Sequence, residues 1–221
     1  MGFALLLGAL LAGGAWLVWR GRRQRRLAFI DGYRFHPALK RKVHERYPHL
    51  SEAQVERVFD GLRDYFHICN QAGRRMVSMP SQAVDVAWHE FILFTRAYQA
   101  FCDRALGRFL HHTPTEAMKT PTLAQNGIKR AWRLACAREG INPSTPLQLP
   151  LLFAIDALLN IEDGYRYSLD CQDRTSPLYG DGYCAGHIGC ASGCGGDSGG
   201  DGDGGSDGGD GGDGGGGCGG D

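Results

Sequence analysis

The first 26 residues constrain the fold of this chain most. An uncharged apolar run extends from Phe3 to Trp19, and five arginines follow it: Arg20, Arg22, Arg23, Arg25 and Arg26. Seventeen helical residues measure about 25 Å, close to the hydrocarbon thickness of a bilayer of about 30 Å. We therefore expect residues 1–26 to form a transmembrane helix with a basic juxtamembrane cluster.

A cleaved signal peptide is the alternative to an anchor, but it carries its positive charge before the apolar run. Here the arginines come after the run, which continues through Trp16 and Trp19 beyond the small residues at 12–15. Because arginines are retained on the cytoplasmic side, we expect a single-pass protein of the inner (cell) membrane with its soluble domain in the cytoplasm. The five arginines are expected to contact anionic lipids of the bilayer.

Charge is segregated along the chain although the net charge is zero. Up to Arg174 there are 24 Lys and Arg against 16 Asp and Glu, and after it there are eight Asp and no base. Five of the positive charges belong to the juxtamembrane cluster, and the remaining excess is ordinary for a globular domain. With no basic stripe and no aromatic RNA-binding motif, we expect no nucleic acid as a partner.

Residues 27–170 are long enough for one domain with its own core, and their apolar spacing is helical. Apolar residues recur at three and four from Ser51 to Gln71, where Ser51 and Gln54 fit a capping box. A longer helix is predicted from Ser81 to about Leu106, with Gly107 at its end. Further helices are expected over 37–47, 123–139 and 150–161, and no segment alternates as a strand does. The sequence predicts an all-α fold, a small helical bundle behind the membrane helix.

Candidate metal ligands gather on the predicted long helix and in the segment after it. Asp85 and His89 are four residues apart and share one helix face, and His111 and His112 follow. Antiparallel packing would bring His67 from the preceding helix to the same place, as in bundles that hold metals between facing helices. Zn or Fe is the expected ion. Adjacent histidines in a helix point about 100° apart, so at most one of His111 and His112 should face the site.

Simpler interpretations compete with this metal site. Asp85 and His89 would then be an ordinary intrahelical pair. His67 would be a residue at the edge of the core. Cys69 and Cys102 fit apolar stripes, where a buried thiol behaves as a small hydrophobic group. The sequence contains no glycine-rich phosphate loop and no nucleophile elbow, so it names no reaction.

A resemblance is carried by VDVAWHEFILFTRAYQAFC, then GRFLHH, and a glycine-rich end. Over about residues 35–195 the chain resembles uncharacterised bacterial glycine-rich-domain membrane proteins. It is also similar to the Trp-His motif region of plant glycine-rich domain proteins, through five residues only: Asp85, Trp88, His89, Tyr98 and Cys102. The resemblance implies a helical domain with a Trp-His motif behind one anchoring helix, and it brings no catalytic activity with it.

Residues 171–194 form a segment rich in cysteine and histidine. Its soft ligands are Cys171, Cys184, His187, Cys190 and Cys194. Four such ligands would satisfy a tetrahedral zinc ion, although the spacings do not match the usual short knuckle, and Cys190 and Cys194 are separated by three residues. Disulfides, disfavoured in the cytoplasm, and free thiols are the alternatives.

Residues 195–221 contain Gly, Asp, Ser and one Cys, without any aromatic or aliphatic side chain. Such a segment cannot offset the entropy cost of ordering, so we expect a disordered tail. Its seven Asp would attract the arginine cluster or a basic partner.

Three functions remain open from the sequence. The first is an interaction or assembly module that binds an unidentified protein, with Trp88, His89 and Tyr98 organising its packing. The second is a hydrolytic or redox enzyme with a metal held by Asp85, His89 and one of the paired histidines. The third is metal binding by residues 171–194.

Overall fold

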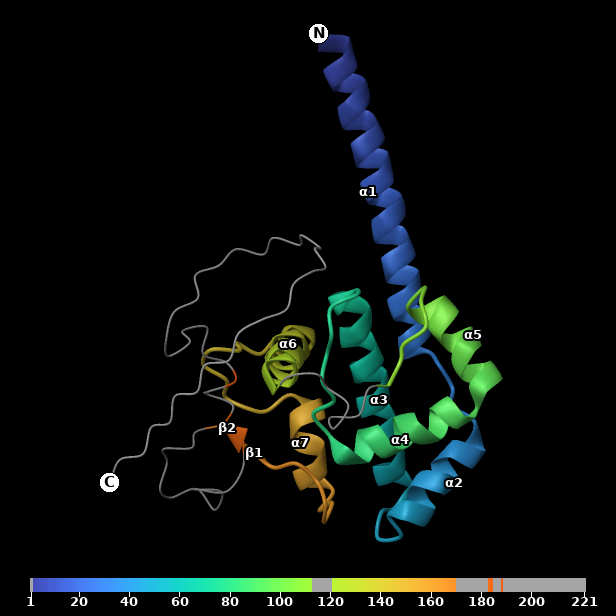
Figure 1. The fold of residues 1–221 in the computed structure, drawn as a ribbon, viewed down its shortest axis with the longest axis vertical. Coiled ribbons are helices and arrows are strands. Elements are labelled where there is room, and N and C mark those ends of the chain that lie inside the picture. Colours follow the sequence, from blue (N-terminus) through green and yellow to red (C-terminus); the bar gives the residue numbers. More distant parts are fainter. Residues whose placement is uncertain (1, 113–120, 170–182, 185–187, 189–221) are drawn as a thin grey trace, which may run out of the picture. The chain divides into compact units, whose positions relative to one another are not determined.

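A computed structural model describes residues 2–112, 121–169, 183–184 and 188. Within these residues the secondary structure is helical except for one short pair of parallel strands, so the all-α prediction is confirmed (Figure 1). The elements are α1 (Gly2–Asp31), α2 (Pro37–Arg46), α3 (Glu52–Ala72), α4 (Gln82–Leu93), α5 (Thr95–Ala105), α6 (Pro121–Glu139), α7 (Leu151–Leu158), β1 (Tyr167–Ser168) and β2 (Tyr183–Cys184).

Helix α3 is the centre of the bundle and packs against α1, α2, α4, α6 and α7. It begins with the predicted capping box, in which the Ser51 N–H donates to Gln54 Oε1 at 2.8 Å and the Gln54 N–H donates to Ser51 Oγ at 3.3 Å. Gly61 allows close approach, because a Cβ there would lie 2.8 Å from Val84 of α4 and 3.3 Å from Ile155 of α7. The helix α3, predicted from its apolar spacing, is therefore buried on several sides.

Aromatic rings join the end of α1 to α3, α4 and α5. Tyr33 meets Phe101 edge-on at 4.7 Å between centroids, and Phe66 lies 4.6 Å from the same ring. Phe91 contacts both Phe66 and Phe101. Because such pairs add to the burial of their large apolar surface, these rings hold four elements in one core.

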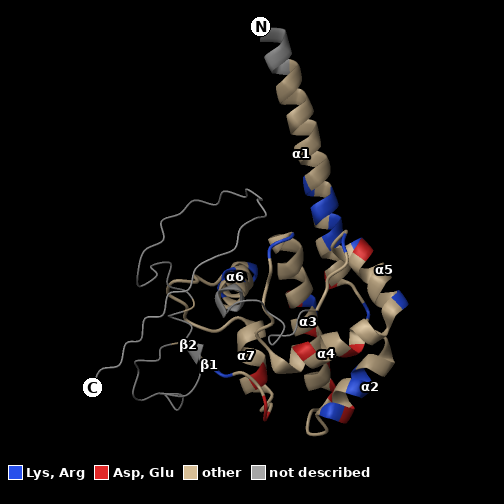
Figure 2. Ribbon diagram, viewed as in Figure 1, with Lys and Arg blue, Asp and Glu red and all other residues tan. Residues whose placement is uncertain are grey.

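The two halves of α1 have different surroundings. Ile30, near its carboxyl end, is fully buried, while Leu10 and Leu11 are 74% and 68% exposed. A band of Lys and Arg separates the exposed apolar half from the bundle (Figure 2). Among the described residues no helix is long and apolar enough to cross a membrane, so the predicted transmembrane helix is not supported. The helix also continues without a break past residue 26, where the sequence suggested a boundary.

The prediction of one long helix over 81–106 is wrong in one respect, because the helix breaks at Phe94. This residue has φ −82° and ψ 58°, and its N–H bonds to the Phe91 carbonyl three residues back. The break turns α5 away from the line of α4, which buries Tyr98 and Phe101 in the core and leaves Thr95 exposed. A stripe that looked continuous in sequence is therefore used by two helices.

Asp156 of α7 anchors the start of α4. Its carboxylate accepts the Ser81 hydroxyl at 2.6 Å and the N–H groups of Gln82 and Ala83 at 2.7 and 3.2 Å. It also accepts the Tyr165 N–H at 2.9 Å. A carboxylate at a helix N-terminus satisfies free N–H groups and the helix dipole together, so this buried charge fixes α4 in place.

Most of the cysteine-rich segment lies outside the described residues. Cys171, His187, Cys190 and Cys194 belong to this part, as do residues 195–221. Cys184 is described through its backbone, which pairs with Ser168. The predictions for residues 171–194 and for the tail therefore stay predictions.

Candidate metal centre

The candidate centre begins in the first two turns of α4. Ser81 caps the helix through its hydroxyl, which accepts the Val84 N–H at 3.1 Å. Asp85 lies in the first turn, where the helix dipole favours a carboxylate, and His89 follows one turn later. Asp85 Oδ2 lies 3.4 Å from His89 Nε2. The predicted four-residue spacing thus places both side chains together on one face.

His112 joins this pair from the segment after α5. Its Nε2 lies 2.8 Å from His89 Nε2 and 3.2 Å from Asp85 Oδ1. The two imidazole rings stand perpendicular to each other, with centroids 4.1 Å apart. Two rings and one carboxylate therefore converge, and Asp85 turns one oxygen toward each ring.

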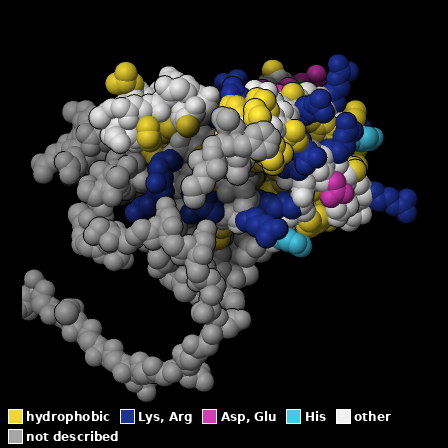
Figure 3. All heavy atoms as spheres, turned by 90° about the horizontal axis from the view of Figure 1, so that it is seen from above, with side chains coloured by type: hydrophobic (Ala, Val, Ile, Leu, Met, Phe, Trp, Pro, Cys, Tyr) yellow, Lys and Arg dark blue, Asp and Glu magenta, His cyan; other side chains and the backbone are white. Residues whose placement is uncertain are grey.

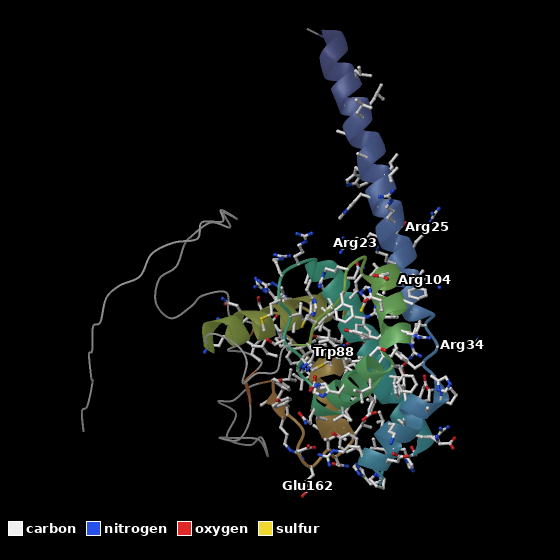
Figure 4. The ribbon with its side chains drawn as sticks, turned by 45° about the vertical axis from the view of Figure 1, so that its right-hand side comes forward. Arg23, Arg25, Arg34, Trp88, Arg104 and Glu162 are labelled. Carbon is white, nitrogen blue, oxygen red and sulfur yellow. The ribbon has the colours of Figure 1, made fainter. Side chains whose placement is uncertain are left out.

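A chain of hydrogen bonds fixes the backbone that carries His112. The Trp88 indole N–H donates to the Tyr98 hydroxyl at 3.0 Å, and that hydroxyl donates to the Leu110 carbonyl at 2.5 Å. Trp88 also packs edge-on against the His112 ring at 4.7 Å, and it lies among the helices in Figure 4. Burial raises the pKa of Tyr98, so its hydroxyl keeps its proton and remains a donor to Leu110. Trp88 and Tyr98 thus position His112.

The other predicted candidates lie elsewhere. His111 is exposed and packs on Phe109 at 4.7 Å, so only one of the paired histidines faces the centre, as expected. His67 is buried and bonds through Nδ1 to the Gln71 amide at 3.1 Å, as in the interpretation that placed it at the core edge. Burial lowers the pKa of His67 to about 4, with Arg138 adding to the effect. Of the two interpretations of His67, the one at the edge of the core therefore fits the structure, and the one that joins it to the site does not.

The two cysteines of the apolar stripes are buried free thiols, as predicted. Cys69 is 2% exposed and Cys102 is fully buried. Burial raises the pKa of Cys69 to about 12 and also raises the pKa of Cys102. Both stay protonated at neutral pH, which suits packing rather than nucleophilic or ligand chemistry.

The donor atoms of the three residues lie close enough together to surround one metal ion, since one ligand atom from each lies within 4.8 Å of the other two. Zinc binds imidazole nitrogen and carboxylate oxygen at about 2.0–2.2 Å, so neighbouring ligands in octahedral or tetrahedral geometry lie about 2.9–3.4 Å apart. The two Nε2 atoms are 2.8 Å apart, and each has its own carboxylate oxygen nearby, Asp85 Oδ1 at 3.2 Å from His112 and Asp85 Oδ2 at 3.4 Å from His89. Hydrogen bonds alone do not satisfy every group of this cluster, because His112 Nε2 has either one proton or one lone pair and faces two partners. A cation would satisfy all three groups together.

The centre is open to solvent on one side. The His89 side chain is 53% exposed, whereas those of Asp85 and His112 are 25% and 17% exposed. With three protein ligands, a bound ion would keep at least one coordination position for water or another ligand. Such an arrangement is chemically able to polarise a bound group or activate water.

The sequence did not predict the residue that supports the backbone of His112. Sequence spacing identified Asp85 and His89 and restricted the choice between His111 and His112. It did not identify Tyr98 as the residue that holds the 110–112 backbone, because that contact spans twelve residues and a helix end. The shared presence of Trp88 and Tyr98 on one stripe was the available signal.

The family model described as UCP032817-like matches residues 25–188 of the chain. This range includes the whole candidate centre and all helices after the first part of α1. No curated protein and no solved structure matches the chain significantly. The description of the family names no activity, so function has to be argued from the residues of the site.

Proposed function

The chain belongs to the UCP032817-like family, and we propose that it binds a divalent transition-metal ion through Asp85, His89 and His112. The observation that carries the proposal is the convergence of two imidazole Nε2 atoms, 2.8 Å apart, on a single carboxylate. The rigid support of His112 by Tyr98 and Trp88 favours a preformed site, because its ligands need little reorganisation on binding.

Two imidazoles and one carboxylate suit zinc or ferrous iron. Zinc with three protein ligands is typical of catalytic sites, in which the fourth position holds water. The same donors on one face are typical of non-haem iron centres. The exposed side of His89 gives such an ion access to solvent. The metal-dependent function is therefore water activation with zinc, or redox chemistry with iron.

We also propose that α1 attaches the domain to a bilayer, with its arginines on the cytoplasmic side. The exposed apolar side chains of α1 support this proposal: Leu7, Leu10, Leu11, Trp16, Leu17, Val18 and Trp19. Two arginines lie over tryptophan rings, Arg20 over Trp16 at 5.2 Å and Arg23 over Trp19 at 5.6 Å. Aromatic and basic residues together are typical of the interface between lipid and water. Sedimentation of the chain with membranes after alkaline extraction tests this attachment.

The metal proposal is tested with His112→Ala and the matched control His111→Ala. Both changes remove a histidine from the same short segment, but only the first removes a ligand. We expect elemental mass spectrometry to find about one equivalent of metal in the His111→Ala chain and little in the His112→Ala chain. Circular dichroism should give the same helical signal for both, because neither ring is part of the apolar core.

The cysteine-rich segment is a second source of metal ligands and needs its own control. Both variants are therefore repeated in the full chain with Cys171, Cys184, Cys190 and Cys194 changed to Ser. Equal metal contents of His111→Ala and His112→Ala in that background would refute the centre. Metal lost only through the serine changes would favour residues 171–194 as the binding site.

A further inference from the structure

A cavity of about 540 Å³ lies beside the carboxyl half of α1 and shares no lining residue with the metal centre. Three elements contribute to it: α1, the end of α3 and the end of α5. Five arginines line it: Arg22, Arg23, Arg26, Arg74 and Arg108. Figure 3 looks onto the chain from above and shows Lys and Arg side chains gathered on this face.

The positive charge of this cavity is not compensated within the described residues. Among the residues that the structure describes, no Asp or Glu lines it. The carboxylate ion pairs of residues 2–112 and 121–169 involve other cations, so none of the five arginines has such a partner there. Guanidinium groups gathered without a counter-charge repel one another, and a bound anion would remove this cost.

Packing holds two of these arginines at the cavity rather than in free solvent. Arg26 lies against Gly107, where a Cβ would overlap its guanidinium group, and Gly107 has φ +70°. Arg108 donates to the Gly73 carbonyl at 2.5 Å, which joins the ends of α5 and α3. Arg74 follows Gly73 and is exposed. The cavity thus lies beside α1 where α3 and α5 end, and each of these ends has a glycine followed by an arginine.

We propose that this cavity binds the phosphate of an anionic phospholipid headgroup. The guanidinium group matches phosphate through paired N–H donors. A lipid source is favoured because Trp19 at the cavity continues into the exposed apolar side chains Leu10, Leu11 and Leu17 of α1, along which acyl chains would lie. This inference rests on the proposed attachment to a bilayer and is independent of the metal centre.

The test compares two neighbouring pairs of arginines in the full chain. Arg26 and Arg74 line the cavity, whereas Arg25 and Arg75 do not. Figure 4 shows Arg25 on the side of α1 away from Arg23, which lines the cavity. Binding is measured by flotation with vesicles of phosphatidylcholine alone and with added phosphatidylglycerol. A single basic residue near an anionic surface contributes about fivefold in affinity whatever its exact position.

We expect R26Q and R74Q each to lower the affinity for phosphatidylglycerol vesicles by about tenfold or more, because each loses a direct phosphate contact. R25Q and R75Q should lower it by about fivefold or less. Equal losses for all four variants would overturn the cavity and leave a diffuse surface effect. Circular dichroism of each variant checks that the fold is kept.

Glycerol phosphate separates the two sources of the ligand. Competition by glycerol phosphate that is lost in R74Q, together with a preference for phosphatidylglycerol vesicles, supports the headgroup site. Binding of glycerol phosphate without any preference between the vesicles would overturn the lipid source and leave a soluble phosphate as the ligand. No binding to either vesicle would instead refute the attachment of α1, since that attachment does not require the cavity.

Discussion

Two carboxylates near the start of α4 have opposite surroundings. Asp156 is 2% exposed and accepts four hydrogen bonds, all from the start of α4 and the segment after α7. Asp85 has a side chain 25% exposed and faces two imidazoles. The Asp156 carboxylate is surrounded by fixed donors and has no capacity left for a ligand. The Asp85 carboxylate lies beside two ring nitrogens and has capacity for one. The first carboxylate therefore holds the fold, and the second is free to act.

The largest expected effect is the loss of Asp156. The change Asp156→Ala leaves the Ser81 hydroxyl and three backbone N–H groups without their acceptor, so we expect it to lower the free energy of unfolding by about 3–5 kcal/mol. Urea denaturation measures this. The control is Asp163→Ala, which removes an exposed pair with Arg46 and should cost less than about 1 kcal/mol. Similar losses for the two variants would contradict the comparison.

The pH dependence of stability tests the same contrast between buried and exposed groups, through the buried imidazole of His67. Burial lowers the pKa of His67 from 6.5 to about 4, so the unfolded chain takes up this proton first as the pH falls. Stability should be complete above about pH 6.5 and lost between pH 6.5 and 4, by about 3 kcal/mol for this group. Denaturation of metal-free protein across this range measures it. His67→Gln should reduce the slope, because it removes the group that takes up the proton.

Asp85→Asn separates function from stability. It keeps the size of the side chain and removes the charge, so we expect metal affinity to fall by about 100-fold or more, as measured by calorimetric titration. The free energy of unfolding should change by less than about 1 kcal/mol, because the side chain is partly exposed. A large loss of stability would show that Asp85 holds the fold in the way that Asp156 does.

The smallest effect is expected from the residue that supports the centre. Tyr98→Phe removes the acceptor of the Trp88 N–H and the donor to Leu110, which should cost about 1–3 kcal/mol of stability. Metal affinity should fall by about tenfold, because His112 loses its fixed backbone. Tyr33→Phe is the control, since its ring packs against Phe35 and Phe101 in the aromatic core and the hydrogen bonds from Trp88 to Tyr98 and from Tyr98 to Leu110 do not involve it. Equal metal affinity in both variants would remove the positioning role of Tyr98.

Local signals account for what the sequence predicted well. The capping box of Ser51 and Gln54 and the glycine after Glu139 mark helix ends through local backbone chemistry, and α3 and α6 begin and end close to these positions. The break at Phe94 was missed because an unbroken apolar stripe does not reveal which of its residues turns to a different neighbour. Periodicity specifies a face but not its partner.

Long-range packing decided the rest of the site. Asp85 and His89 are close because of helix geometry, but His112 reaches them through the path of residues 107–112, which the Tyr98 hydroxyl fixes. Of the residues that line the arginine cavity, the sequence indicated only those of α1, as the cluster after the apolar run. The rest of the cavity is signalled by Gly73-Arg74 and Gly107-Arg108, two helix ends with the same glycine-arginine order and positive φ at each glycine.

The continuity of α1 has a mechanical consequence. Because Ile30 is buried in the bundle and the helix is unbroken from Gly2 to Asp31, the apolar half and the bundle are joined by a stiff rod with no hinge. Inserting one helical residue between the two would turn them by about 100° relative to each other, and a second would turn them by about as much again. The angle about the helix axis between the apolar half of α1 and the histidines of the bundle is thus set by the number of residues between them.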